Sequence, residues 1–118
     1  MSAEIKSQPF SHAEIAQARS ATFKTVLDHL GAHVKQDNDY TPLDPARRSV
    51  RLQVGYQGRD FRLVVTGEKF VNELLPVETA SRGGGGAIDL VKHITGLGFV
   101  QSVKACLDAL AAQQVAGK

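Results

Sequence analysis

The spacing of apolar residues predicts one long amphipathic helix early in the chain. Ser11 and Glu14 are spaced as in a capping box, in which each side chain binds the backbone N–H of the other residue. Apolar residues then recur at helical intervals, and Gly31 is a typical helix end. The residues at this helical spacing are Ile15, Ala18, Thr22, Val26 and Leu30, joined by Phe23 and Leu27. We therefore expect a helix over 11–30 that packs its stripe on another element.

Downstream of this helix the apolar period changes to two, which predicts β-strands. Apolar residues occupy alternate positions over 50–56 and again over 61–65. Gln57-Gly58 between these runs predicts a tight turn, and a further glycine turn leads to a third strand over 69–75. The sequence therefore predicts a three-stranded antiparallel meander.

The remaining segments predict two loops and two more helices. Pro42 and Pro45 place a loop before the strands. A loop over 76–86 ends in four consecutive glycines and precedes a short helix over 87–95. After a second glycine-rich break, helical periodicity returns over 99–113.

Together these elements predict an α+β fold. It consists of a small three-stranded antiparallel sheet, a long N-terminal helix and two C-terminal helices. A chain of 118 residues without internal repeats is of the size of one domain. We expect a flexible lead over 1–10, a single domain over 11–113 and a tail over 114–118.

Composition and charge narrow the classes of protein that fit. The net charge of +2 is too small to indicate a nucleic-acid partner by itself. The single cysteine, Cys106, excludes an internal disulfide and, at core spacing in the last helix, is expected to pack as a small hydrophobe. No apolar run has the length of a membrane span, and Met1–Pro9 lacks the apolar stretch of a signal peptide. These features predict a cytoplasmic protein with no membrane partner.

The four glycines at 83–86 resemble a phosphate-binding loop but lack its chemistry. A P-loop needs Lys followed by Ser or Thr after its last glycine, and here Ala87 and Ile88 follow. A dinucleotide fingerprint needs a third glycine where Ile88 or Asp89 stands. Two interpretations stay open. Either the glycines form an architectural turn, because they allow positive φ, expected at Gly84 and Gly85, and close backbone approach, or their free amides, together with Arg82, contact a nucleic-acid backbone.

The segment from Gly84 to Leu107 resembles the zinc-binding (zinc-ribbon) domain of bacterial DNA primases. The matching residues are Gly84-Gly85-Gly86-Ala87-Ile88-Asp89-Leu90-Val91, His93, Gly96-Leu97, Phe99, Val103 and Leu107. The segment is most similar to the version of this domain that precedes Toprim domains in primase-like and relaxase-associated proteins of plasmids and integrative elements. A less specific resemblance extends over 22–111. It implies a ribbon-like sheet with a DNA-binding role.

The chain departs from this family at the zinc ligands. The family holds zinc with Cys-Pro-x-His and a later Cys-x-x-Cys, whereas Asp44 and Arg47 stand at the first cysteine and the histidine. A structural zinc site needs four ligands of the Cys or His type, so we expect a degenerate, metal-free ribbon without a cofactor. His29 and His33 have a chelating spacing only if the helix continues past Gly31, which we do not expect.

Arginines give the strongest candidate for a binding surface. Arg51 and Arg62 occupy polar positions of adjacent predicted strands, so they should share the face opposite the apolar side chains. Two interpretations stay open, a solvated face whose charges prevent strand-to-strand aggregation and a patch that follows a single-stranded backbone. Tyr56 would add base stacking to such a patch only if it were exposed, but alternation favours its burial. The predicted nucleic-acid-binding residues are Arg47, Arg48, Arg51, Arg59, Arg62 and Arg82.

These observations predict a non-catalytic DNA-binding accessory protein, with single-stranded DNA favoured, of plasmid or mobile-element replication or conjugative transfer. The alternative is a protein-interaction regulator or inhibitor that docks on a replication, conjugation or host-defence complex. A small enzyme is disfavoured because Asp28 with His29 and Asp89 with His93 are weak catalytic pairs, and no serine lies in a nucleophile motif. The catalytic carboxylates of primases belong to a different domain.

Overall fold

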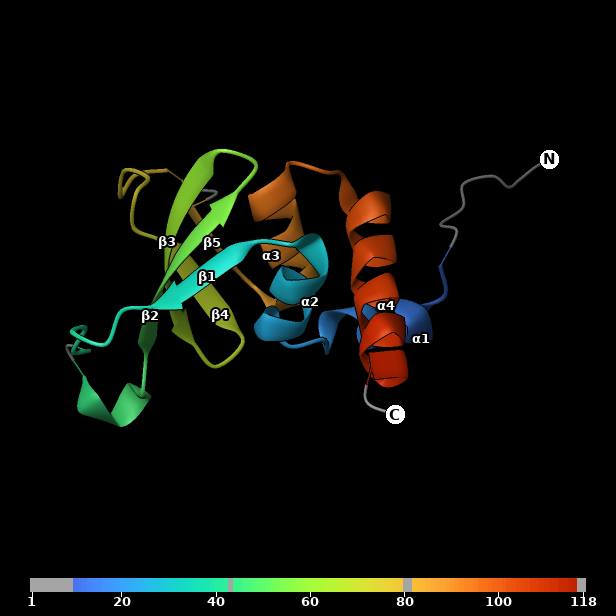
Figure 1. Cartoon of the computed structure of the whole chain (residues 1–118), viewed down its shortest axis with the longest axis horizontal. Helices are drawn as coiled ribbons and strands as arrows, with labels where there is room; N and C mark the ends of the chain where they lie inside the picture. Colours follow the sequence, from blue (N-terminus) through green and yellow to red (C-terminus); the bar gives the residue numbers. More distant parts are fainter. Residues whose placement is uncertain (1–9, 43, 80–81, 117–118) are drawn as a thin grey trace.

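The structure, a computed structural model, describes residues 10–42, 44–79 and 82–116 (Figure 1). It has an α+β fold in which an antiparallel sheet lies beside a group of helices. The strands are β1 (His33–Gln36), β2 (Val50–Tyr56), β3 (Arg59–Thr66), β4 (Lys69–Asn72) and β5 (Gly83–Gly85). The helices are α1 (His12–Arg19), α2 (Phe23–Leu30), α3 (Gly86–Thr95), α4 (Phe99–Ala116) and the short 3₁₀ helix η1 (Pro45–Arg47).

The sheet has five strands in the order β1-β2-β3-β4-β5, so the prediction of three strands was wrong. The predicted meander is confirmed as β2, β3 and β4, with Gln57 and Gly58 at positive φ in the first turn. β1 was missed because its sequence, His-Val-Lys-Gln, contains a single apolar residue and no alternation. β5 was missed because three glycines carry no pattern at all.

The predicted helix over 11–30 is two helices. The capping box at Ser11 and Glu14 is confirmed at the start of α1. Ser20 ends this helix, and the Thr22 side chain then accepts a hydrogen bond from the Thr25 N–H as the N-cap of α2. This second cap interrupts the helix although the apolar spacing continues through it. Gly31 ends α2 with a φ of 75°, as predicted.

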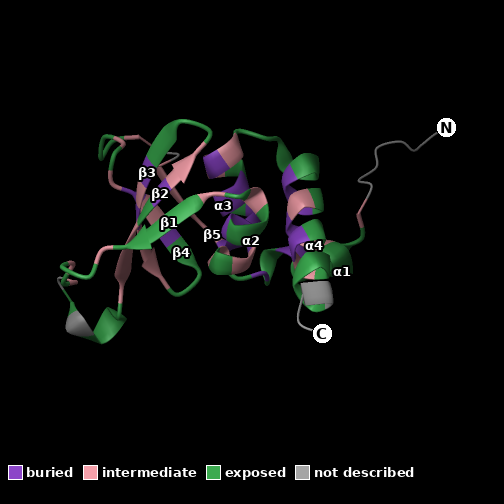
Figure 2. Ribbon diagram, in the orientation of Figure 1, coloured by how far each residue is buried: buried purple, intermediate pink, exposed green. Residues whose placement is uncertain are grey.

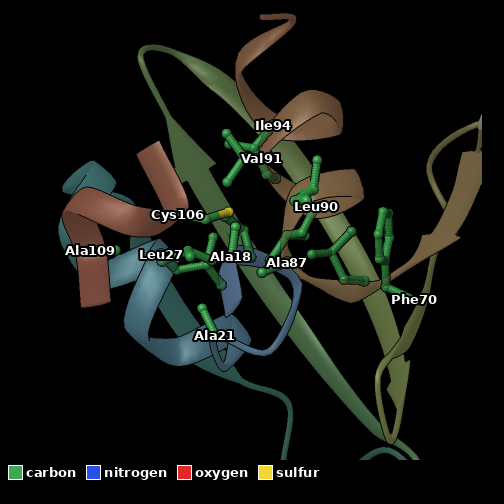
Figure 3. Close-up of a cluster of buried hydrophobic side chains, with 14 of the residues drawn as sticks. Ala18, Ala21, Leu27, Phe70, Ala87, Leu90, Val91, Ile94, Cys106 and Ala109 are labelled. Carbon is green, nitrogen blue, oxygen red and sulfur yellow. The ribbon is translucent and has the colours of Figure 1, made fainter. Parts of the chain in front are cut away.

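The helices cover one face of the sheet in two layers. Figure 1 shows α2 and α3 beside the sheet, with α4 and α1 on their far side. Buried residues of the sheet meet α2 and α3, and Figure 3 shows Leu27, Phe70, Leu90 and Ile94 in this core. Cys106 is buried in the same cluster, as predicted, and burial raises the pKa of its thiol to about 11. The thiol is therefore neutral at physiological pH.

The ends of the described chain extend beyond the predicted domain. Phe10, placed in the lead over 1–10, packs against the core, and α4 continues to Ala116, inside the predicted tail over 114–118. The rest of the lead and residues 117–118 lie outside the described residues. Within the described part, no single helix is long and apolar enough to cross a membrane. α3 and α4 meet these criteria only together and are bent by 113°.

Candidate nucleic-acid interface

The sheet face away from the helices carries the central arginines. In the β2–β3 register Arg51 lies opposite Val64 and Arg62 lies opposite Gln53. Because side chains alternate along a strand, Arg51 and Arg62 point to the same face, diagonally across the two strands. No helix of the described chain covers this face (Figure 1). The predicted sharing of one face is therefore confirmed, and we call this surface the open face.

Two acidic residues hold these arginines in an ion-paired network. Arg51 contacts Asp37 through Nη2 at 2.7 Å and Nε at 2.9 Å. Glu73 Oε1 lies 3.4 Å from Arg51 Nη1 and also 3.4 Å from Arg62 Nε. The guanidinium of Arg51 further lies over the ring of Tyr40, 4.9 Å from its centroid. The arginine pair is thus partly neutralised and held in place.

The Asp37–Arg51 pair fixes the charge state of both groups. The hydrogen bond from Arg51, followed by one from the Asp39 N–H, lowers the pKa of Asp37 below its usual value. The same hydrogen bond raises the pKa of Arg51. A lowered carboxyl pKa stabilises the fold at pH values above the pKa of the unfolded chain, and this contribution is lost as pH falls through the folded pKa. The pair is therefore intact at neutral pH.

The other predicted arginines do not extend this network. Arg47 forms an exposed ion pair with Asp44 at 3.6 Å, and Arg48 follows it in the left-handed conformation. Arg82 donates to the carbonyl of Leu75 at 3.3 Å. Arg59 lies over the ring of Phe61, 5.3 Å from its centroid, and Phe61 belongs to the helix-covered face. Arg59, one of the predicted nucleic-acid-binding residues, therefore lies on the opposite face of the sheet from Arg51 and Arg62.

Two lysines on the open face were not predicted. Lys35 of β1 pairs with Gln53, and Lys69 of β4 pairs with Thr66, so both share the face of Arg51 and Arg62. Lys35 was missed because β1 itself was missed. Lys69 could have been found by extending the alternation of the meander into its third strand. Tyr56, which was considered for base stacking, packs against the core, as alternation favoured.

Backbone amides of the glycine segment are hydrogen-bonded within the protein. The Gly86 N–H donates to the Glu68 carbonyl at 2.7 Å, and the Gly85 N–H donates to Asp89 Oδ2 at 3.1 Å. These two amides are therefore not free for a nucleic-acid backbone. Among the four glycines only Gly86 has positive φ, at 84°. The architectural interpretation of the loop gains support from this positive φ and from the close backbone approach at Gly83 and Gly84, whereas Gly84 and Gly85 do not have the positive φ that was expected.

A cleft of about 480 Å³ beside α3 contains the residues considered as a catalytic pair. Its His93 ring lies near the rings of Phe61 and Phe70, and its Nε2 is 3.0 Å from the Asn72 side-chain nitrogen. The Asn72 oxygen accepts two backbone N–H groups, so its nitrogen donates and His93 Nε2 accepts. Asp89 is bound to Gly85 instead. The two residues therefore hold separate structural contacts.

The described residues contain no cluster of potential metal ligands. Within residues 10–42, 44–79 and 82–116 no group of three or more His, Cys, Asp or Glu side chains is placed to hold a metal ion. At the two positions where the primase family has its first zinc ligands, Asp44 and Arg47 form an ion pair with each other.

We expect the purified protein to contain no stoichiometric zinc and to keep its melting temperature in excess EDTA. We expect the core of buried apolar side chains to supply enough stability without a metal. Elemental analysis and thermal melting with and without chelator measure this. One zinc per chain, or loss of the folded baseline in EDTA, would contradict it, because a structural zinc site unfolds when its metal is removed.

The fold and the open face define an α+β protein with an antiparallel sheet, one face of which is covered by helices while the other carries Arg51 and Arg62 (Figure 1). Comparisons of the chain with protein-family models, with curated proteins and with solved structures found no match in any of the three. The resemblance to primase zinc-ribbon domains therefore stays a prediction from the sequence.

Proposed function

We propose that the protein binds single-stranded nucleic acid, with DNA favoured, along the open face. It would act as a non-catalytic accessory protein of plasmid or mobile-element replication or transfer in the cytoplasm. The observation that carries the proposal is that Lys35, Arg51, Arg62 and Lys69, on four neighbouring strands, share one helix-free face. The sequence resemblance to primase zinc-ribbon domains supports the same class of ligand.

Binding on this face would use phosphate contacts and one stacking surface. The four cations offer a track for the backbone, and phosphate contacts position a strand without reading its sequence. Tyr40, beneath the Arg51 guanidinium, adds a planar group of the kind on which bases stack. Asp37 and Glu73 compete with phosphate for the arginines. We therefore expect weak affinity, on the order of micromolar, with strong salt dependence.

Titration of labelled single-stranded DNA against salt tests the proposal. Neutralising about four phosphates predicts a slope of log K against log salt near about −3. The double variant Arg62→Gln/Lys69→Gln should flatten this slope by about 1.4 and weaken all sequences alike. Asp37→Asn should strengthen binding, because it releases Arg51 from its carboxylate partner. Fluorescence anisotropy at several salt concentrations measures all three quantities.

A matched control separates the open face from overall charge. Lys24→Gln/Lys104→Gln removes the same charge from exposed ion pairs on α2 and α4, which lie on the helix side of the sheet and not on the open face. It should leave the slope unchanged. Equal effects of the two double variants would contradict binding on the open face. Absence of binding to single- and double-stranded DNA at low salt would contradict the nucleic-acid proposal and favour the protein-docking alternative.

A further inference from the structure

The outer edge of β1 is an unpaired strand edge. β1 is the first strand of the sheet and, among the residues that the structure describes, pairs only with β2; its residues are exposed (Figure 2). The Asp37 N–H donates to the Arg51 carbonyl at 2.8 Å, which fixes the alternation of the ladder. Lys35 and His33 therefore direct their backbone groups to β2, while Val34 and Gln36 direct theirs outward. This edge can accept hydrogen bonds from another strand.

An apolar groove adjoins this edge on the helix side. It has a volume of about 440 Å³ and lies between α2 and the strands. Its lining residues are Lys24, Leu27, Asp28, Val34, Gln36 and Leu52. Val34 is 42% exposed although it lies on the helix-covered face of the sheet, opposite the buried Val54. A strand paired with β1 would place every second side chain over this groove.

The opposite side of β1 is basic. His33 and Lys35 point to the open face, and across the described residues neither has an ion-pair or hydrogen-bond partner for its side chain. On the groove side, by contrast, Lys24 is already paired with Asp28 at 2.8 Å. A strand added to β1 would therefore meet apolar surface on one side and, on the other, the unpaired ammonium of Lys35 and the ring of His33.

We propose that β1 binds an extended segment of a partner protein in which acidic and apolar residues alternate. The backbone of the segment pairs with Val34 and Gln36, its apolar side chains enter the groove, and its carboxylates face His33 and Lys35. Addition of a peptide strand to an open sheet edge is a common mode of recognition, in which backbone bonds give affinity and side-chain positions give specificity. This proposal does not depend on nucleic-acid binding by the open face.

A second copy of the chain fits this edge poorly. If two copies of β1 pair antiparallel with Val34 opposite Val34 or Gln36 of the other copy, Lys35 lies opposite His33 or Lys35. In the register with Gln36 opposite Gln36, Lys35 lies opposite Asp37, whose carboxylate Arg51 already holds. Like charges directly opposite each other destabilise a strand pair, and an edge lysine is a common barrier to edge-to-edge association. The charge of β1 thus selects an acidic partner strand and disfavours self-pairing.

Two labelled peptides of about eight residues test the proposal. One alternates glutamate with valine, and the other alternates lysine with valine, so they share every apolar position. The glutamate peptide should bind about fivefold or more tightly than the lysine peptide, because cross-strand charge pairs favour one and oppose the other. Lys35→Glu should reverse this order. Equal binding of the two peptides by the parent protein, or no binding of either, overturns the proposal.

Substitutions at Val34 test the backbone contact. Val34→Pro removes an outward N–H and leaves the bonds to β2 in place, so it should abolish binding of the glutamate peptide. Val34→Thr keeps both the N–H and the side-chain shape and should retain binding. Thermal melting of both variants verifies the fold. Equal affinity of the two variants overturns the proposed pairing.

Hydrogen exchange tests the proposed strand pairing on the parent protein, without any substitution. In the free protein the amides of Val34 and Gln36 should exchange quickly, and the glutamate peptide should slow both while leaving Lys35 unchanged. Unchanged exchange at Val34 and Gln36 under saturating peptide overturns the proposal. So does a concentration-dependent dimer in light scattering that Val34→Pro converts to monomer, because the edge would then serve a second copy of the chain.

Discussion

Alanine at Gly83 or Gly84 is expected to destabilise the protein by about 1–3 kcal/mol, the typical cost of overpacking a well-packed site. A Cβ at Gly83 would lie 2.6 Å from the Phe70 carbonyl oxygen, in the backbone of the neighbouring strand. A Cβ at Gly84 would lie 2.9 Å from Asp89 Cβ. Neither distance occurs between real atoms of this kind, so β4 or α3 must move. Gly83 should show the larger effect, because its obstacle is backbone.

The next two glycines provide a graded comparison within the same segment. Gly86 has a φ of 84° and ordinary space around it, so Gly86→Ala should cost about 1–2 kcal/mol through backbone strain. Gly85 is extended, with φ −137° and ψ 137°, and a Cβ there would meet no atom closer than 3.8 Å. Gly85→Ala should therefore be close to neutral, because the lower entropy of the unfolded chain is offset by the poorer N-cap that alanine gives α3.

Urea unfolding of the four single variants measures this series. The architectural interpretation requires that Gly85→Ala lower the free energy of unfolding less than the other three substitutions do. Four equal free energies of unfolding would contradict it. If Gly84→Ala melts like the parent protein but loses binding to single-stranded DNA, the segment is a binding site and its glycines serve the ligand rather than the fold.

The parts of the fold that the sequence predicts are those governed by local chemistry. The β2–β3 hairpin follows from alternation on both sides of Gln57-Gly58, and the start of α1 follows from the capping box at Ser11 and Glu14. Gly31 ends α2 because a residue at positive φ is needed there. Each of these signals lies within a few residues of the feature that it specifies.

The missed elements depend on contacts that are distant in the sequence. β5 consists of glycines that approach Phe70 and Asp89 closely, and neither neighbour can be identified from the glycines themselves. β1 is a short edge strand whose sequence carries one apolar residue, so its pairing with β2 gives the only sign of it. In both cases tertiary pairing, rather than local pattern, determines the strand.

The candidate site, like the fold, could be predicted only where local sequence pattern determines it. Alternation alone places Arg51 and Arg62 on one face. Their partners were not predictable, because Asp37 and Glu73 lie just beyond the ends of β1 and β4, and strand ends are the least reliable part of a sequence-based assignment. The structure, and not the sequence, therefore shows that the arginines of the open face form an ion-paired network with Asp37 and Glu73.

Alanine at Asn72 is expected to destabilise the protein by about 2–4 kcal/mol. Asn72 is 3% exposed and joins the sheet to α3. Its side-chain oxygen accepts from the Arg62 N–H at 3.2 Å and the Leu74 N–H at 3.1 Å, at the end of the β3–β4 ladder. Removing it leaves two backbone donors without this acceptor, and an unsatisfied buried donor costs about 1–3 kcal/mol. The contact to His93 is lost as well.

Asn38→Ala is the matched control for this substitution. Asn38 lies in an exposed turn, so the same chemical change there should alter the free energy of unfolding by no more than about 0.5 kcal/mol. Urea unfolding compares the two variants, and hydrogen exchange should show faster exchange at the Arg62 and Leu74 amides in Asn72→Ala alone. If Asn72→Ala costs no more than Asn38→Ala, then the Asn72 side chain does not close the ladder, and water or a backbone shift satisfies both amides instead.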